Sequence, residues 1–279
     1  MLPAPPRLWI VATPLGNIDD FSPRARAVLA DCDCILAEDT RRAQRLCAAC
    51  ALSPKRLLSF FDHNEDERLS DVLSWLRQGQ HIALISDAGT PLLADPGYRL
   101  VRACRLEGLP VSPVPGPSAP VCALQASGLP PLPYSFLGFL PRETQAKRRL
   151  FLSFSALPGS LVFFERADRL VNSLTLAFEV LGSRELAVCR ELTKTYEEFI
   201  LTRLENVNTL SGLLGELTLV IGPSDVRVRS DTSLVREALA KALRTEGKVK
   251  AAVRCVQASV NGWSGKELYA LAEELKSMS

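Results

Sequence analysis

The side chains of this sequence that can do chemistry gather in short polar segments, each of which follows an apolar run. Residues 86–90 contain two hydroxyls, a carboxylate and a glycine, and they come directly after Ile82–Ile85. Residues 38–42 hold two carboxylates, a hydroxyl and two guanidiniums, directly after Cys34–Ala37. Carboxylates can accept protons, and guanidiniums can bind phosphate or another anion. Both segments are therefore candidate functional sites.

Three further segments of this kind follow other apolar runs. Residues 13–17 set a glycine beside an asparagine, residues 62–65 contain one of only two histidines, and residues 115–119 combine proline, glycine and serine. Each segment also has a structural interpretation. Asp39 or Thr40 can cap a helix, a glycine can serve a tight turn, and a single histidine is more often structural than catalytic.

Apolar runs and helical stretches alternate through the first half of the chain. The predicted strands are residues 8–12, Cys34–Ala37, 57–61, Ile82–Ile85 and Val111–Val114, and the predicted helices are residues 23–30, Thr40–Ala49, 65–78 and 96–107. This order is typical of a parallel sheet with helices on both faces. Ser22 and Asp95 each precede a proline and are expected to cap helices. Because parallel strands end at one sheet edge, the five polar segments predict a cleft there.

A proline- and glycine-rich stretch, residues 113–133, separates this first half from a second set of elements. Strands are predicted at residues 134–139, 161–164, 185–190, 199–202 and 217–221, and helices at residues 119–127, 145–155 and 169–181. The later strands follow one another closely, which predicts a mixed sheet. We expect an α/β domain over residues 1–117, a second one over 118–223, and a small extension over 224–279.

The extension, residues 224–279, is predicted to form three amphipathic helices at residues 233–244, 249–260 and 264–275. Ser264 and Glu267 have the spacing of a capping box. The segment contains 10 Lys and Arg against 7 Asp and Glu. This bias is compatible with a nucleic-acid module, and equally with a helical appendage for dimerisation or solubility.

Composition sets limits on the class of protein. The chain has 279 residues, 47% of them hydrophobic, and a net charge of +2, which by itself does not indicate a polyanion partner. It lacks both an apolar run long enough to cross a membrane and the pattern of a signal peptide, so we expect a cytoplasmic protein with no membrane partner. Four of the eight cysteines, Cys32, Cys34, Cys47 and Cys50, have spacings compatible with zinc, but they are better interpreted as small core residues.

Charged residues also end two predicted strands of the second half. Glu165 and Arg166 follow Phe163 and Phe164, and residues 190–194 contain Glu191 and Lys194. Such residues can form a salt-bridge network, or they can supply acid and base groups to a cleft.

The polar segments, taken in order, resemble a known family. Residues 13–17, 37–41, 62–65, 86–91, 95–97, 115–119, 138–141, 190–194 and 215–216 are similar to motifs of the tetrapyrrole methylase superfamily of S-adenosylmethionine (SAM)-dependent methyltransferases. The similarity is strongest to its 16S rRNA (cytidine-2′-O)-methyltransferase branch, and it covers about residues 8–222. It implies an α/β fold with two domains of the tetrapyrrole methylase (class III SAM methyltransferase) type, a small C-terminal helical extension, SAM bound between the domains, and a homodimer.

The resemblance also implies roles for individual residues. Those implied to bind the cofactor are Pro14, Gly16, Asp87, Ala88, Gly89, Thr90, Pro115, Gly116, Ser118, Ala119 and Phe164. The chain departs from the family at Phe164, where a tyrosine is usual, and at Arg166, where a serine is usual.

The implied reaction transfers the methyl group of SAM to the ribose 2′-hydroxyl of a cytidine in 16S rRNA, and the implied partner is this rRNA in the small ribosomal subunit. It needs no metal, because the sulfonium is already a good leaving group. Asp39, Glu165 and Glu191 are the candidate catalytic bases or hydrogen-bond acceptors. The candidate substrate-binding residues are Arg41, Arg42, His63 and Lys194.

Two other interpretations remain open. The chain can be a methyltransferase of corrin or sirohaem synthesis, although residues 37–41, residues 190–194 and the helical extension favour the rRNA branch. It can also be a non-catalytic RNA- or ribosome-binding protein that keeps the fold, although the intact segment 86–91 argues against this.

Overall fold

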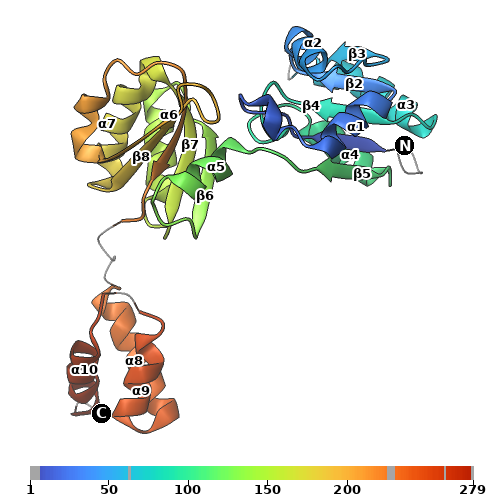
Figure 1. The fold of residues 1–279 in the computed structure, drawn as a ribbon. Coiled ribbons are helices and arrows are strands. Elements are labelled where there is room, and N and C mark those ends of the chain that lie inside the picture. The colour runs from blue at the N-terminus through green and yellow to red at the C-terminus, as the bar shows by residue number, and fades with distance from the viewer. Residues whose placement is uncertain (1–6, 62–63, 225–229, 261, 278–279) are drawn as a thin grey trace. The chain divides into compact units, whose positions relative to one another are not determined.

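A computed structural model describes residues 7–61, 64–224, 230–260 and 262–277 (Figure 1). The chain divides into two compact units, Met1–Pro223 and Ser224–Ser279. His63, a predicted substrate-binding residue, lies outside the described residues. The first unit contains two sheets and the second a group of helices, and the domain boundaries drawn from the sequence stay predictions.

The first sheet is the parallel sheet that the sequence predicts. Its strands are β1 (Leu8–Val11), β2 (Cys34–Ala37), β3 (Leu57–Ser59), β4 (Ile82–Ile85) and β5 (Val111–Val114), in the order β3-β2-β4-β1-β5. Every neighbouring pair is parallel. Strands β1 and β4 are therefore central neighbours, and the segments that follow them lie at one edge.

Helices cover both faces of this sheet, as predicted. They are α1 (Pro23–Asp31), α2 (Thr40–Ala49), α3 (Glu65–Arg77) and α4 (Tyr98–Leu106). Helices α1 and α2 pack with Trp9 and Val11, whereas α3 and α4 pack with Leu8 on the opposite face. Because side chains alternate along a strand, this burial on both faces explains why the runs are apolar throughout. The Ser22 cap of α1 is confirmed, since its side chain accepts a hydrogen bond from the Ala25 amide.

The predicted start of α4 is wrong. The sequence places an N-cap at Asp95, but the helix begins at Tyr98 and Gly97 is the capping position. The amide of Leu100 in the first turn donates instead to Oε1 of the buried Glu65, at 3.1 Å. A carboxylate from α3 therefore replaces the local cap, and Asp95 is left in the loop before the helix.

The second sheet is mixed, as the close strand spacing predicts. Its strands are β6 (Tyr134–Phe139), β7 (Ser160–Arg166), β8 (Glu185–Arg190), β9 (Glu198–Arg203) and β10 (Glu216–Ile221), in the order β6-β7-β10-β8-β9. Only β6 and β7 pair in parallel, and the other neighbours are antiparallel.

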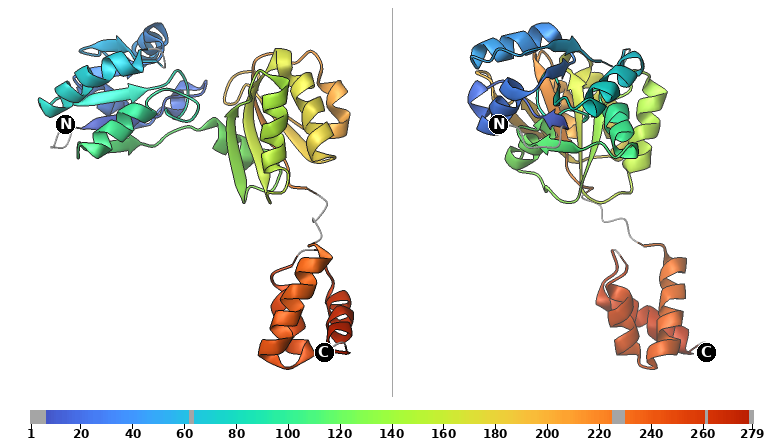
Figure 2. Two further views of the ribbon diagram at one scale, coloured as in Figure 1. Left: turned by 180° about the vertical axis from the view of Figure 1, so that it is seen from behind. Right: turned by 90° about the vertical axis from the view of Figure 1, so that its right-hand side faces the viewer.

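Helices also cover both faces of the second sheet (Figure 2). Helices α6 (Thr144–Phe154) and α7 (Leu170–Leu181), with the 3₁₀ segment η3 (Leu204–Leu210), pack on one face, and α5 (Ala119–Ala126) packs on the other. A short 3₁₀ turn, η2 (Ala167–Arg169), joins β7 to α7. The carboxyl end of β7 is thereby held directly against α7.

The second unit contains the three helices predicted from its periodicity, α8 (Thr232–Glu246), α9 (Val249–Gln257) and α10 (Gly265–Ser277). Each contributes apolar side chains to one core, including Leu239, Val253 and Leu268. The predicted capping box is confirmed: the amide of Glu267 donates to Ser264 Oγ at 3.2 Å, and the amide of Ser264 donates to Glu267 Oε2 at 2.8 Å.

The cysteines are free thiols. Cys32, Cys34 and Cys47 are buried in the first unit, which fits their interpretation as small core residues. Burial raises the pKa of Cys32 to about 12. Among the described residues, no group of three or more His, Cys, Asp or Glu side chains is placed to hold a metal ion. No helix within the described ranges has the length and apolar character needed to cross a bilayer.

Candidate functional site

The polar segments at the carboxyl edge of the first sheet bond to one another. Thr13 and Gly89 form an isolated antiparallel bridge between the segments after β1 and β4, with N···O distances of 2.8 and 3.1 Å. The Thr90 hydroxyl donates to the carbonyl of Pro117 at 2.9 Å, which ties in the segment after β5. The segments after β1, β4 and β5 therefore converge as predicted, and most of these hydrogen bonds are between backbone groups.

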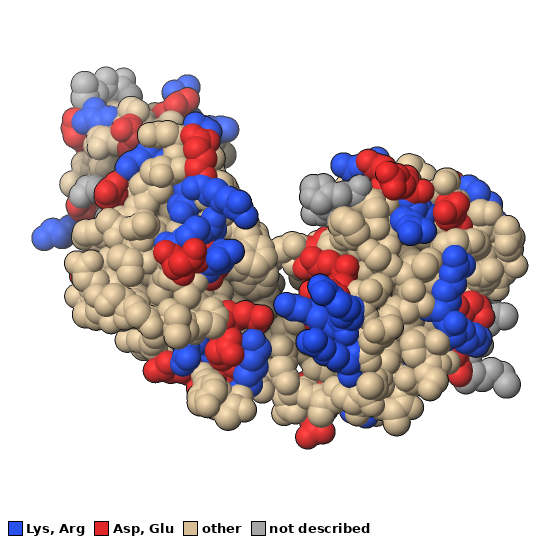
Figure 3. Space-filling model, turned by 90° about the horizontal axis from the view of Figure 1, so that it is seen from above, with Lys and Arg blue, Asp and Glu red and all other residues tan. Residues whose placement is uncertain are grey.

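A cleft of about 700 Å³ lies between this edge and the second sheet. We call the first sheet with its helices the first lobe, and the second sheet with its helices the second lobe. The first lobe lines the cleft with the segments after β1, β2 and β4, and the second lobe lines it with the ends of β6 and β7 and the start of β10. In the space-filling view, acidic and basic side chains gather along both sides of the hollow between the two lobes (Figure 3). The volume is within the range of about 300–1,000 Å³ that small-molecule sites usually have.

Many of the predicted cofactor-binding residues line this cleft. They are Asp87, Ala88, Gly89, Thr90, Ser118, Ala119 and Phe164. Pro14, Gly16, Pro115 and Gly116 belong to the same converging segments but are not among its lining residues. Of the other candidates, Glu165 and Arg42 line the cleft, whereas Asp39, Glu191, Arg41 and Lys194 do not.

Gly89 is needed at the turn of the segment after β4. Its φ is +79°, a conformation that L side chains rarely adopt, and a Cβ there would meet Leu15 Cδ2 at 3.0 Å. The same residue makes both backbone bonds to Thr13. Any larger residue at this position would strain the wall of the cleft.

The Asp87 carboxylate connects two walls of the first lobe. Its Oδ1 accepts a hydrogen bond from the amide of Asp39 at 3.1 Å, and its Oδ2 lies 3.3 Å from Nη1 of Arg42. The Arg42 side chain is 59% exposed, so its charge remains available to a ligand in the cleft. Asp87 and Arg42 together provide one negative and one positive group on the same wall.

Asp39 has the geometry of a helix cap. Its Oδ1 accepts from the amide of Arg41 at 2.8 Å, and both of its oxygens receive hydrogen bonds from the Arg41 guanidinium. These bonds from Arg41 lower the pKa of Asp39 to about 2. A carboxylate with so low a pKa is a weak base near neutral pH. Glu38, its neighbour, is the acidic residue of this segment that lines the cleft.

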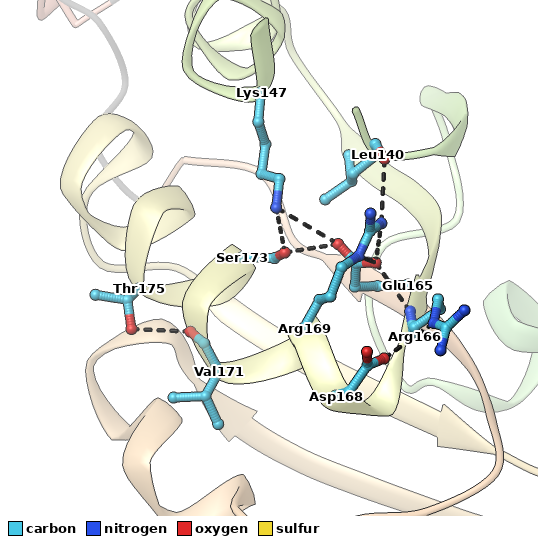
Figure 4. Close-up of polar contacts among 9 residues, drawn as sticks. All are labelled: Leu140, Lys147, Glu165, Arg166, Asp168, Arg169, Val171, Ser173 and Thr175. Carbon is cyan, nitrogen blue, oxygen red and sulfur yellow. Dashed lines mark hydrogen bonds and ion pairs between the residues drawn. The ribbon is translucent and has the colours of Figure 1, made fainter. Parts of the chain in front are cut away.

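Glu165 lies at the end of β7 with its carboxylate fully occupied (Figure 4). Oε1 accepts from Arg169 Nε at 2.8 Å and from the Arg166 amide at 2.9 Å, and Arg169 Nη2 bonds to the same oxygen. Oε2 accepts from Ser173 Oγ at 2.6 Å and lies 3.7 Å from Lys147 Nζ, which itself donates to Ser173 at 2.6 Å. Glu165 and Lys147 are almost completely buried.

Glu191 and Lys194 form a second charged group, and neither residue lines the cleft. Lys194 Nζ lies 3.1 Å from Glu191 Oε1 and 3.0 Å from Glu216 Oε2. The hydrogen bond from the Glu216 amide is the largest of the contacts that lower the pKa of Glu191. Gly16 packs against the Lys194 side chain, where a Cβ would come within 2.3 Å of Lys194 Cγ. The amide of Asn17 donates to Thr193 Oγ1 at 3.2 Å, which joins the two lobes here.

An aromatic surface and an exposed ion pair complete the second-lobe wall. The Phe164 ring lies 5.2 Å from that of Phe139 and 5.1 Å from that of Phe136, measured between ring centroids. Arg166 Nε donates to Asp168 Oδ1 at 3.0 Å. Phe164, Phe139, Arg166 and Asp168 all line the cleft.

Sequence reasoning did not assign several of the lining residues. They are Leu15, Glu38, Leu93, Ala94, Asp95, Pro120, Phe139, Ala167, Asp168, Leu214, Gly215, Glu216, Leu217 and Thr218. For Glu38 a signal existed, because the capping preference of Asp39 leaves Glu38 as the carboxylate directly after the strand. For Leu93 and Ala94 there was none, since the chain turns at Leu92 and Ala94 with positive φ at non-glycine residues.

The fold and the cleft define the class of protein. Residues 7–208 match the family model described as tetrapyrrole (corrin/porphyrin) methylases, so the chain belongs to this family. A uroporphyrin-III C-methyltransferase from Thermus thermophilus, solved in complex with S-adenyl homocysteine, shares the fold with a TM-score of 0.56 at 18% identity, over 77% of this chain and 97% of that one. The predicted fold class is confirmed.

The curated relatives narrow the class to one branch of the family. Ribosomal RNA small subunit methyltransferase I of Escherichia coli O157:H7 is 46% identical over 68% of this chain and 67% of its own length. The protein of the same name from Mesorhizobium japonicum is 38% identical over 99% of this chain and 95% of its own length. The chain is therefore a member of the ribosomal RNA small subunit methyltransferase I branch, as the motif order predicted.

Proposed function

We propose that this chain is an SAM-dependent methyltransferase that methylates the ribose 2′-hydroxyl of a cytidine in small-subunit (16S) ribosomal RNA. The cleft between the two α/β lobes is the single observation that carries the methyltransferase assignment, because four polar segments far apart in the sequence combine to line or brace it. The names of the curated relatives support small-subunit rRNA as the substrate. The motifs shared with the cytidine-2′-O branch support the position of the methyl group.

The lining residues fit SAM chemically. The molecule has an adenine with two apolar faces, a ribose with two hydroxyls and an amino-acid end with both charges. The cleft offers apolar surface at Leu15, Leu93 and Phe164, and a charged group at Asp87. A site with both kinds of surface suits a ligand that is part apolar and part zwitterionic. The Gly89 turn adds a close backbone approach on the same wall.

The bound cofactor would supply a methyl group on a sulfonium, and the protein must then place the 2′-hydroxyl in line with it. The converging segments are suited to this task, because hydrogen bonds tie their backbones to one another rather than to solvent. Alignment alone can contribute several kcal/mol to catalysis. Arg42 is placed to hold a phosphate of the substrate, and Glu38 and Asp87 are placed to accept a hydrogen bond within the cleft.

The three carboxylates that the sequence offers as bases are each bonded to other groups of the protein. Asp39 caps α2, Glu191 pairs with Lys194, and Glu165 is saturated by Arg169, Ser173 and the Arg166 amide. We propose that they shape the site and that none of them takes the hydroxyl proton. Lys194 and Arg41 remain candidates for phosphate contacts outside the cleft.

We also propose a homodimer that works in the cytoplasm, where its rRNA substrate is made. Strand β9 is an edge strand of the second sheet, and two of its apolar side chains, Phe199 and Leu201, are 38% and 60% exposed. An exposed apolar edge strand is a suitable surface for self-association. Light scattering of the purified chain would measure the oligomeric state, and a monomer at micromolar concentration would contradict this part of the proposal.

An assay on the purified chain tests the proposed reaction. Isotope-labelled SAM is incubated with the protein and with small ribosomal subunits that lack the modification, and the RNA is digested to nucleosides. The expected result is label in 2′-O-methylcytidine. Label in a base-methylated nucleoside would contradict the ribose assignment. Labelling of a uroporphyrinogen in a parallel reaction, with no labelling of RNA, would favour the tetrapyrrole alternative.

A further inference from the structure

Arg166 is the last residue of β7, and it lines the cleft beside Glu165. Its guanidinium pairs only with Asp168 among the contacts that the structure describes for it, and the two side chains are 66% and 63% exposed. An exposed ion pair of this kind contributes little to stability. Stabilisation of the fold therefore does not explain why Arg166 and Asp168 are paired at this position.

The backbone that carries Arg166 is, by contrast, held rigidly. Its amide donates to Glu165 Oε1 at 2.9 Å, and the same carboxylate is fixed by Arg169 and Ser173. Arg169 Nη2 also donates to the carbonyl of Leu140 at 3.2 Å, which joins this turn to the segment after β6. In Figure 4 the Arg166 side chain lies on the side of Glu165 away from Ser173 and Lys147. A buried network thus positions an exposed cation.

The first lobe presents a similar arrangement to the same cleft. Arg42 lies 3.3 Å from Asp87, with its side chain 59% exposed. Each lobe therefore contributes one arginine that is paired with a carboxylate at the surface of the cleft. A phosphate accepts two parallel hydrogen bonds from a guanidinium and can replace such a carboxylate at little cost in stability.

We propose that Arg166 binds a backbone phosphate of the RNA substrate, exchanging Asp168 for the phosphodiester, and that it acts with Arg42 of the other lobe. The inference rests on the proposed function, since it requires RNA in the cleft. The exposure of Arg166 favours RNA over the cofactor as its ligand. A side chain that is about two-thirds exposed can contact a macromolecule at the rim of the cleft more readily than it can contact a small molecule enclosed in the cleft. Asp168 then acts as a placeholder that keeps the guanidinium in position when RNA is absent.

The test compares Arg166→Gln and Asp168→Asn with the wild-type chain. Binding to unmodified small ribosomal subunits is measured over a series of salt concentrations, together with SAM affinity and the KM and kcat of methylation. Arg166→Gln is expected to weaken RNA binding about threefold to tenfold at low salt. It should lower the slope of log K against log salt by about 0.7 to 0.9, leaving SAM affinity and kcat within about twofold. Asp168→Asn is expected to bind RNA as tightly as wild type or more tightly.

Arg148→Gln is the matched control, because Arg148 forms an exposed ion pair with Glu179 on the same lobe but does not line the cleft. Wild-type RNA affinity and salt slope in Arg166→Gln would overturn the proposal, as would a loss of SAM affinity without a change in RNA binding. Equal losses of RNA affinity in Arg166→Gln and Asp168→Asn would also overturn it, since the intact ion pair, and not the arginine alone, would then be what RNA binding requires. A wild-type chain that neither binds nor methylates the subunit would overturn the proposed function as well.

Discussion

At the scale of single residues, the clearest question is what Glu165 does in the cleft. It lies where a base could act, yet its carboxylate is fully buried and every contact described for it is to a cation, an amide or a hydroxyl. Burying a carboxylate is tolerated when it is paired in this way, and removing one partner leaves buried charge uncompensated. Glu165 is thus expected to stabilise the fold.

Glu165→Gln is predicted to lower the free energy of unfolding by roughly 3 kcal/mol, because Lys147 and Arg169 lose their buried counter-charge. Urea denaturation followed by circular dichroism measures this change. Glu179→Gln, which breaks the exposed pair with Arg148, is the control and should cost less than about 1 kcal/mol. A Glu165→Gln chain with wild-type stability and no methyl transfer would instead identify Glu165 as the base.

Asp39 provides a prediction about pH. Its pKa is about 2 in the folded chain against 3.8 ordinarily, because Arg41 bonds to the carboxylate. The folded state therefore favours the charged form, which stabilises the protein above pH 3.8 and loses this effect as the pH falls toward 2. Asp39→Asn keeps a capping side chain and should have near-wild-type activity at neutral pH while losing part of the acid dependence of stability. A large loss of kcat at neutral pH in Asp39→Asn would show a catalytic role.

At the scale of elements, buried strands were predicted best. The bounds of β2 and β4 follow directly from their apolar runs, because both faces of these interior parallel strands are covered. The start of α4 failed because a tertiary contact, Glu65 to Leu100, overrides a local capping signal. The loop before it turns at Leu92 and Ala94 with positive φ, which no residue preference indicates.

The segment after β4 gives a prediction about the cofactor. Gly89→Ala places a Cβ 3.0 Å from Leu15 and forces an alanine into φ of +79°, so the Thr13 bridge should shift. A distortion of about 1.4 kcal/mol weakens binding about tenfold, and we expect at least this loss of SAM affinity by calorimetry. Gly108→Ala is the control, since it has a φ of +70° but open space around its Cβ. Equal SAM affinities for the two variants would contradict the role given to residues 86–90.

At the scale of the whole molecule, the segments that form the cleft were predicted better from the sequence than the individual side chains that line it. The order of the motifs identified the family, and strand ends predicted the cleft edge of the first sheet. The second wall was predicted only in part: the sequence indicated Phe164 and Glu165, whereas Glu216 enters the cleft through the antiparallel pairing of β7 with β10. The saturation of Glu165 by Lys147 and Ser173 depends on α6 and α7 packing side by side, which a linear pattern does not show.

Ribose methylation of a cytidine in small-subunit rRNA can be measured in cells. Mass spectrometry compares this rRNA from cells that lack the gene with rRNA from the same cells supplied with the gene again. A 2′-O-methylcytidine is expected to disappear in the deletion strain and to return with the wild-type chain. A ribose-methylation profile that is the same with and without the gene would contradict this expectation.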